Sequence, residues 1–390
     1  MAEADANDHG LDLDRVKEVF EVSKDFTIGL EEEFLLLDPE SLELVHRFEE
    51  IYALCQSDGV LADSAAGELI DTEIEIRSGR GETFGEAVQQ QQASRDRLFS
   101  LAESSGVALG SVGAHPWADD RDQQIIDTPH YRRLQHDLGW VAQRNNTWSM
   151  HVHVGINGAD RAVAVSDRLR EYLPILLAVS ANSPFLDGRD SGLHSVRTEI
   201  FTRSFPRCGV HQPFVDWDTY AGFVELLHRT GTIVEATQLW WSVRPHHHFG
   251  TVEVRICDAQ TDGAESTALA GLAAACVGQP ALDSDEVGGR NHDLRLDREI
   301  EENFWRAIRY GMDGEMIDFE AGEVVPTREL LERTVEWASP AAEAMGITVD
   351  LPAMNGAQRA REAFEQGESL EEILRLSVDL TARSYSPERS

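Results

Sequence analysis

Four short segments of this chain alternate charged or imidazole side chains with aliphatic ones, residue by residue. They are Phe26–Asp38, Leu69–Arg77, Trp148–Ile156 and Thr251–Cys257. Because successive side chains of a β-strand point to opposite faces of the sheet, each segment predicts a strand with one polar and one apolar face. The polar faces are expected to line the concave side of an open or curved sheet. That side is where we expect a functional site.

The remaining predicted elements do not alternate as strand, helix, strand, which is the order that parallel sheets require. Further strands are expected at Val107–Ala114 and Thr237–Arg244, the second of which forms a hairpin with the segment after the turn His246–Gly250. An irregular stretch is expected at 184–217. Helical patterns cover residues 12–24, 83–105, 130–143, 160–181, 263–279, 297–310, 327–345 and 357–383. The predicted fold class is α+β, with an antiparallel sheet flanked by helices.

The chain contains no internal repeat, no low-complexity tract and no long linker that would divide it. We expect an N-terminal helix and tail over residues 1–25 and a catalytic domain over 26–311. A helical C-terminal portion over 312–390 is expected to pack on the same domain.

Charge composition excludes several functions. The chain carries 70 acidic and 34 basic side chains among 390 residues, a formal net charge of −36, which argues against nucleic-acid binding by bulk electrostatics. Lys17 and Lys24 are the only lysines. Chemistry that needs a lysine deep in the chain is excluded, such as a Walker A motif, a kinase strand lysine or a Schiff base to pyridoxal phosphate. Any nucleotide phosphates have to be held by arginine and metal.

The same composition bears on where the protein works. An acidic, lysine-poor surface indicates a salt-accumulating halophile, because at molar salt the Debye length falls to about 3 Å and charge repulsion is screened. An acidic mesophilic protein is the alternative. The cysteines are widely spaced and fit a reducing cytosol: Cys55, Cys208, Cys257 and Cys276. Apolar runs are shorter than the roughly 20 residues of a membrane helix. We expect a cytoplasmic protein with no membrane partner. Whether it forms a homo-oligomer is left open by the sequence.

Each of the four predicted strands places ionisable side chains on its polar face. They are Glu31 and Glu33; Asp71, Glu73, Glu75 and Arg77; His151 and His153; and Glu253 and Arg255. Any one cluster could be solvated surface or a set of ion pairs, but acidic faces on two strands favour a metal site. Oxygen ligands with one nitrogen favour Mg²⁺ or Mn²⁺ over Zn²⁺. Several carboxylates around divalent ions, with arginines nearby, suit the binding of a triphosphate.

The same segments carry a resemblance to a known family. Its motifs here are Gly29–Phe34, Glu68–Leu69 with Ile74–Ile76, His151–Gly155, Asn182–Phe185 with Ser195–Arg197, Trp240–His246, Gly250–Arg255 and Asn303–Gly311. In order and spacing they resemble the type 2 glutamate–cysteine ligase family, which includes the carboxylate–amine ligases and, for so acidic a chain, haloarchaeal γ-glutamylcysteine synthetases. The resemblance implies a glutamine-synthetase-like fold, an open funnel of antiparallel strands that binds ATP and Mg²⁺, with Mn²⁺ as an alternative.

The resemblance also implies roles for individual residues. The implied metal ligands are Glu31, Glu33, Glu68, Glu75, His151 and Glu253. Glu253 and Arg255 are implied to be catalytic, with Arg255 meeting the transferred phosphate. Arg244 and Asn303 are implied to contact ATP together with Arg255.

Periodicity and resemblance differ at Glu68. Strict alternation puts Glu68 out of phase with Glu75, so Glu68 would need a bulge or a loop to reach the same site. Periodicity alone prefers Asp71 or Glu73 as the ligand. We follow the motif and predict Glu68.

Substrate contacts are expected from the irregular stretch and the motif after it. Arg197, Arg203 and Arg207 could clamp carboxylates by bidentate pairing, with surface ion pairs as the alternative. Trp240 and Trp241 could wall the site, with packing in an aromatic core as the alternative. The reaction implied by the family joins the γ-carboxylate of glutamate to the amine of cysteine through γ-glutamyl phosphate, giving γ-glutamylcysteine, ADP and phosphate. No residue in the motifs can be identified as recognising the thiol of cysteine, so another amine acceptor is the alternative within the family. A metal-dependent hydrolase or a non-enzymatic metal-binding protein is the alternative outside it.

Overall fold

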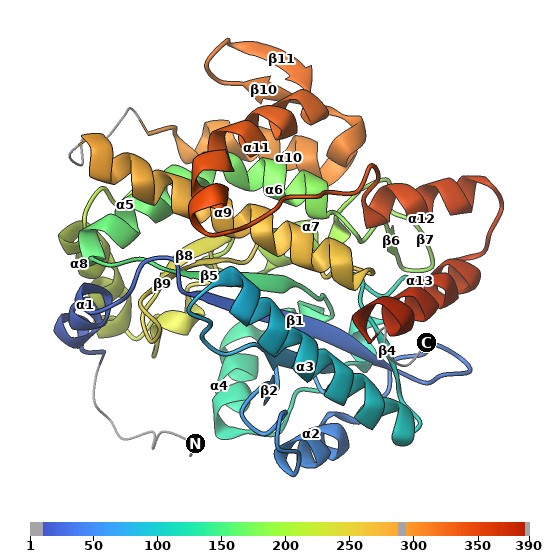
Figure 1. Ribbon diagram of the computed structural model, residues 1–390. Helices are drawn as coiled ribbons and strands as arrows, with labels where there is room; N and C mark the ends of the chain where they lie inside the picture. The colour runs from blue at the N-terminus through green and yellow to red at the C-terminus, as the bar shows by residue number, and fades with distance from the viewer. Residues whose placement is uncertain (1–10, 288–293, 387–390) are drawn as a thin grey trace.

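The computed structural model describes residues 11–287 and 294–386. Its centre is a seven-stranded antiparallel sheet in the order β2-β3-β1-β5-β9-β8, in which β4 pairs with the C-terminal end of β1 (Figure 1). The strands are β1 Ile28–Leu37, β2 Ala65–Ala66, β3 Glu73–Arg77, β4 Ala108–Gly110, β5 Met150–Gly155, β8 Val243–His246 and β9 Thr251–Val254. The sheet is open, with β2 and β8 at its edges. The prediction of an α+β fold on an open antiparallel sheet is confirmed.

Helices surround this sheet. Their bounds are α1 Leu13–Glu21, α2 Phe48–Gln56, α3 Phe84–Ser104, α4 Pro129–Leu138, α5 Ala159–Leu169, α6 Leu173–Ser180, α7 Val196–Ser204, α8 Trp217–Arg229, α9 Gly263–Val287, α10 Asp297–Tyr310, α11 Thr327–Ala344, α12 Gly356–Glu365 and α13 Leu370–Tyr385. Helices α3, α5 and α9 contact the strands, and α11 packs on α9 from the far side (Figure 1). The sheet thus has one face covered by two layers of helices.

The main core lies between the sheet and these helices. Val152 and Val154 of β5 and Val252 and Val254 of β9 are buried in one cluster with Leu272 of α9. Burying each such side chain contributes about 1.5–3 kcal/mol to folding. Because alternation sends all four valines to the helical side, the side chains between them point to the opposite face of the sheet.

Several predicted elements differ from the structure. The helix predicted at 357–383 is two helices, α12 and α13, and the strand predicted at Thr237–Arg244 is formed only from Val243 onward, in β8. The long helix at 160–181 is broken at Arg170–Tyr172 by a 3₁₀ turn, and Pro174 begins the next helix in the first turn, where proline is tolerated. The stretch 184–217 is not irregular throughout, because Ser195 caps α7 by accepting a hydrogen bond from the Thr198 amide. The C-terminal portion is not purely helical, since β10 Glu315–Asp318 and β11 Glu323–Pro326 form a hairpin.

The second predicted strand is shorter than expected. Residues 69–72 are not part of β3, which begins at Glu73. The Asp71 amide donates instead to the Gln124 carbonyl, and Ile70 forms an isolated bridge with Ile125. The segment between β2 and β3 is therefore a loop that leaves the sheet.

The C-terminal helices pack on the same body as the sheet. The Thr381 hydroxyl of α13 donates to the Thr261 carbonyl, and the Tyr385 hydroxyl donates to the Gln260 carbonyl at 2.6 Å. Within residues 11–287 and 294–386, no helix has both the length and the apolar character that crossing a bilayer requires.

Candidate active site

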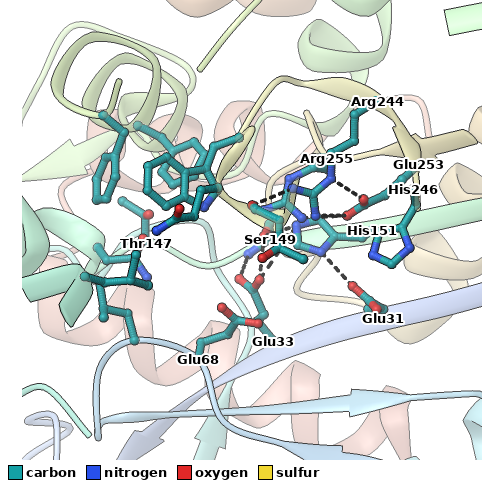
Figure 2. A pocket seen from close by; sticks show the side chains of 18 of the residues that line it. Glu31, Glu33, Glu68, Thr147, Ser149, His151, Arg244, His246, Glu253 and Arg255 are labelled. Atoms are coloured by element: carbon teal, nitrogen blue, oxygen red, sulfur yellow. Dashed lines mark hydrogen bonds and ion pairs between the residues drawn. The ribbon is translucent and has the colours of Figure 1, made fainter. Parts of the chain in front are cut away.

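The polar face of the sheet forms the floor of a cavity of about 330 Å³ (Figure 2). Side chains from β1, β3, β5, β8 and β9 make up this floor. Its walls come from the loop before β3, from α4 and the residues after it, from α7, and from residues 235–240. Segments that are far apart in the sequence therefore meet in one cavity of the size that small-molecule sites have.

Strand register brings the predicted polar residues side by side. Glu31 of β1 lies directly opposite His151 of β5, and His153 lies opposite Glu253 of β9. Glu253 in turn lies opposite Arg244 of β8. Because residues directly opposite in neighbouring strands have Cβ atoms about 5 Å apart, this register places the groups within contact distance.

The contacts among these groups are short. The Glu31 carboxylate lies 2.9 Å from His151 Nδ1 and 3.4 Å from His153 Nε2. The Ser149 hydroxyl donates to Glu33 at 2.8 Å and lies 2.9 Å from His151 Nε2 (Figure 2). Hydrogen bonds thus link Glu33, Ser149, His151 and Glu31 in one continuous chain, and His153 lies beside it.

Seven side chains fall into three groups whose candidate ligand atoms lie within 4.8 Å of one another, which we call the three ligand groups. They are Glu31, Glu75 and His151; Glu31, His153 and Glu253; and Glu33, Glu68 and Glu75. All six predicted ligands are among them. The additional member is His153, which the sequence had marked only as the partner of His151 in a His-x-His pair.

Glu68 reaches the cavity from the loop between β2 and β3. Because Glu68 lies in a loop, the alternation of side chains along β3 does not fix its direction. Glu68 lines the cavity together with Glu33. Asp71 instead pairs with His46 at 2.6 Å, outside the cavity. Glu73 is buried on β3 but belongs to none of the three ligand groups.

Crowding of carboxylates shifts their pKa values upward. Burial, with the charge of Glu33 beside it, raises the pKa of Glu68 to about 7. Burial also raises the pKa values of Glu73 and Glu75 well above their usual range, and the neighbouring carboxylates add to this effect. A positive charge among these groups would remove the repulsion.

Two arginines hold Glu253 in the charged form. Arg244 Nε and Arg255 Nη1 each donate to its carboxylate at 2.6 Å. Although burial opposes it, these two guanidinium groups hold the pKa of Glu253 well below its usual range. Arg255 lines the cavity, and its Nε is buried without a hydrogen-bond partner among the described residues.

Arg197 also lines the cavity, from the first turn of α7. Its guanidinium donates to the carbonyls of Ile256 and Arg255, each at 3.0 Å, and lies 3.6 Å from the Asp258 carboxylate. These contacts fix the group at the cavity wall.

Two other predicted contacts, Trp241 and Arg203, lie away from the cavity. Trp241 is buried in the main core, whereas Trp240, which was also predicted to wall the site, does line the cavity. Arg203 is half exposed and pairs weakly with Glu199 of the same helix. Alternation and helix periodicity explain both positions, because adjacent residues point to different sides.

Asn303 and Arg207 bind backbone rather than line the cavity. Asn303 of α10 donates to the Ile317 carbonyl and accepts from the Ile317 amide, each at 2.8 Å, which ties α10 to β10. Arg207 donates to the Gln238 carbonyl at 3.0 Å and stacks over Trp240. The direct ATP contact predicted for Asn303 therefore does not fit its position in the fold.

The fold matches that of solved ligases. A glutamate–cysteine ligase from Francisella tularensis, solved in complex with AMP, superposes with a TM-score of 0.65 at 10% identity over 94% of this chain and 90% of that one. A bifunctional glutathione synthetase from Pasteurella multocida superposes with a TM-score of 0.64 at 11% identity, over 95% of this chain and 54% of that one. These two superpositions show that the chain shares its fold with both solved enzymes.

Sequence comparison identifies the family. Residues 27–378 match the model of Glutamate-cysteine ligase family 2 (GCS2), and the chain belongs to this family. A relative from Rubrobacter xylanophilus named "Putative glutamate--cysteine ligase 2-2" is 41% identical over 83% of each chain. Another from Sorangium cellulosum, named "Putative glutamate--cysteine ligase 2", is 38% identical over 90% of this chain and 91% of that one. The protein is therefore an enzyme of the ligase class, as the motifs predicted.

Proposed function

We propose that the protein joins the γ-carboxylate of glutamate to the amine of cysteine at the expense of ATP, through γ-glutamyl phosphate. The observation that carries this proposal is the set of three ligand groups on one sheet face, next to Arg244 and Arg255. The AMP in the structure of the Francisella ligase supports a nucleotide as co-substrate.

The residues present fit divalent cations. Five carboxylates and two imidazoles make up the three ligand groups, a set dominated by the hard oxygen ligands that Mg²⁺ and Mn²⁺ prefer. Glu75 Oε2 and His153 Nε2 are buried without a hydrogen-bond partner among the described residues, which leaves each with free capacity to bind a cation. When bound, the ions would neutralise phosphate oxygens of the nucleotide.

The chain's own residues supply the remaining charge. The glutamate carboxylate and the γ-phosphate are both anionic, so their approach needs positive groups between or beside them. Arg255, aligned by Glu253, would stabilise the negative charge of the transferred phosphoryl group. Arg197, fixed at the wall, would bind a substrate carboxylate, and Trp240 would limit the access of water to the acyl phosphate.

The test is turnover with defined components. With Mg²⁺, ATP and glutamate present, we expect release of ADP that depends on cysteine, together with formation of γ-glutamylcysteine detected by mass spectrometry. Chelation with EDTA should abolish both, and Mg²⁺ or Mn²⁺ should restore them. If ADP were released with another amine but not with cysteine, that amine and not cysteine would be the acceptor. Metal-dependent hydrolysis of a substrate in the absence of ATP would indicate that the protein is a hydrolase and not a ligase.

We also propose a salt-rich cytoplasm as the setting, on the basis of the net charge of −36. Dilution from molar KCl to about 0.1 M is expected to unfold or inactivate the protein, because the Debye length grows to about 10 Å and the carboxylates then repel one another. Circular dichroism and activity across a KCl series would measure the effect, with an equal osmolarity of sucrose as the control. Full stability at low salt would contradict the proposal.

A further inference from the structure

Glu68 differs from the other members of the three ligand groups in the kind of backbone that carries it. The other six side chains lie on β1, β3, β5 and β9, where hydrogen bonds to neighbouring strands fix the backbone. Glu68 lies in residues 67–72, between β2 and β3, which we call the ligand loop. Contacts outside the sheet therefore have to fix its position.

Electrostatic repulsion disfavours the place that Glu68 occupies. It shares a ligand group with Glu33 and Glu75, and the candidate ligand atoms of the three lie within 4.8 Å of one another. Figure 2 shows Glu68 beside Glu33. Ionised carboxylates this close repel one another, and burial leaves little water to screen them. A ligand loop that was free to move would carry Glu68 away from the other two carboxylates, and a cation would have to draw it back on binding.

The residues on either side of Glu68 are held by the segment that leads into α4. The Tyr131 hydroxyl donates to the Gly67 carbonyl at 2.6 Å, and the Ile126 amide donates to the Leu69 carbonyl at 3.1 Å. One hydrogen bond before Glu68 and one after it thus connect the ligand loop to residues 126–131.

Gly67 packs directly against Phe48, the first residue of α2. A Cβ atom on residue 67 would lie 2.4 Å from the Phe48 ring, so glycine alone fits there without a shift of the backbone. The ligand loop is therefore bounded by α2 and hydrogen-bonded to α4.

Helix α4 gives Tyr131 a fixed position. The helix begins at Pro129, and the Thr128 hydroxyl caps it by accepting a hydrogen bond from the Tyr131 amide at 3.1 Å. Leu134, less than one turn after Tyr131, packs with Leu69 in a small apolar cluster, and both line the cavity with Tyr131. The helix that forms one wall of the cavity thus also holds the ligand loop.

We infer that Tyr131 is a positioning residue for the cation site, because its hydrogen bond to Gly67 holds the Glu68 carboxylate next to Glu33 and Glu75. The inference rests on the proposed function, since it needs the three ligand groups to bind divalent ions. Tyr131 acts on the backbone of the ligand loop and is not a ligand itself. A variant without its hydroxyl keeps all seven ligands but loses part of their arrangement.

The expected effect is on cation affinity. Loss of an outer-shell partner of a metal ligand typically costs about 10–100-fold in metal affinity. Because Tyr131 acts through a single backbone hydrogen bond, Tyr131→Phe is expected to raise the Kd for Mn²⁺ by about tenfold, at the low end of that range. Titration of the full-length protein with Mn²⁺ in the absence of nucleotide, with free Mn²⁺ followed by electron paramagnetic resonance, measures this Kd without any turnover.

Two further variants define the comparison. Glu68→Gln removes the charge of the loop ligand and is expected to weaken the same Mn²⁺ binding step by at least as much as Tyr131→Phe. Tyr385→Phe is the matched control, because its hydroxyl also donates to a backbone carbonyl at 2.6 Å, that of Gln260, but Tyr385 does not line the cavity. It is expected to keep the natural Kd for Mn²⁺.

Turnover gives a second measurement. In Tyr131→Phe the Mg²⁺ concentration for half-maximal ligation should rise about tenfold, a larger change than that in kcat at saturating Mg²⁺. A general loosening of the fold would lower the folded fraction, which circular dichroism measures, and would not shift the Mg²⁺ requirement alone.

The outcomes separate the inference from the proposed function. A natural Kd for Mn²⁺ in Tyr131→Phe, or an equal rise in Tyr385→Phe, would overturn the inference while the cation site stands. If Glu68→Gln bound Mn²⁺ as the natural protein does, Glu68 would not be a ligand and Tyr131 would have no ligand to position. Failure of the natural protein to bind Mn²⁺ would overturn the proposed cation site together with the inference.

Discussion

Replacing Glu31 with glutamine is expected to lower kcat/KM for ligation by about 100-fold or more, with the fold retained. Glu31 belongs to two of the three ligand groups and contacts His151 and His153, so its charge acts at the centre of the site. A bound divalent ion contributes several kcal/mol of charge stabilisation, and loss of a charged ligand removes a corresponding part of it. Steady-state kinetics over a Mg²⁺ series would measure the loss.

The neighbouring residue provides the matched control. Glu32→Gln makes the same chemical change one residue away, but on the opposite face of β1, where the side chain contacts Arg95. We expect this variant to keep kcat/KM near the natural value at temperatures at which it is folded. A Glu31→Gln enzyme with undiminished activity, or equal losses in both variants, would contradict a metal-binding role for the polar face.

Much of the polar face could be predicted from the sequence because alternation is a local property. Within one strand, alternate side chains lie on the same face of the sheet. The sequence alone therefore predicts that Glu31 shares a face with Glu33, and His151 with His153. Register between strands is not local. His153 faces Glu253 because of the way β5 and β9 pair. This pairing makes His153 a member of a ligand group, a role that the sequence analysis had not predicted for it.

The walls of the site were harder to predict. Helix α7 is short, and its signal was the capping residue Ser195 three positions before Thr198, within a stretch otherwise rich in turn formers. Asn303 matches a family motif, yet its amide binds the backbone of β10, which is a tertiary contact that no local pattern encodes. Glu68 illustrates the opposite case, since periodicity had placed it out of phase, whereas the motif selected it and the structure places it in the cavity.

Glu32 shows how one strand serves both chemistry and stability. Period two sends it away from the cavity and into the helical layer, where it is buried among α3 and α9. Arg95 Nε donates to its carboxylate at 2.8 Å and Gln91 donates at 2.9 Å, and the Ser266 hydroxyl also donates to it. Although burial raises it, the charge and hydrogen bonds of Arg95 bring the pKa of Glu32 below its usual value.

Glu32→Gln is therefore expected to lower the free energy of unfolding by about 3–5 kcal/mol, because it leaves the Arg95 guanidinium buried without its counter-charge. Urea unfolding in molar KCl, followed by circular dichroism, would measure the loss. Adding Arg95→Met to this variant should recover part of the stability, since removing both charges costs less than removing one. If Glu32→Gln proved as stable as the natural protein, the pair would not anchor α3 to the sheet. The strand that carries Glu31 and Glu33 would then depend for its position on its pairing with β3, β4 and β5 and on apolar packing.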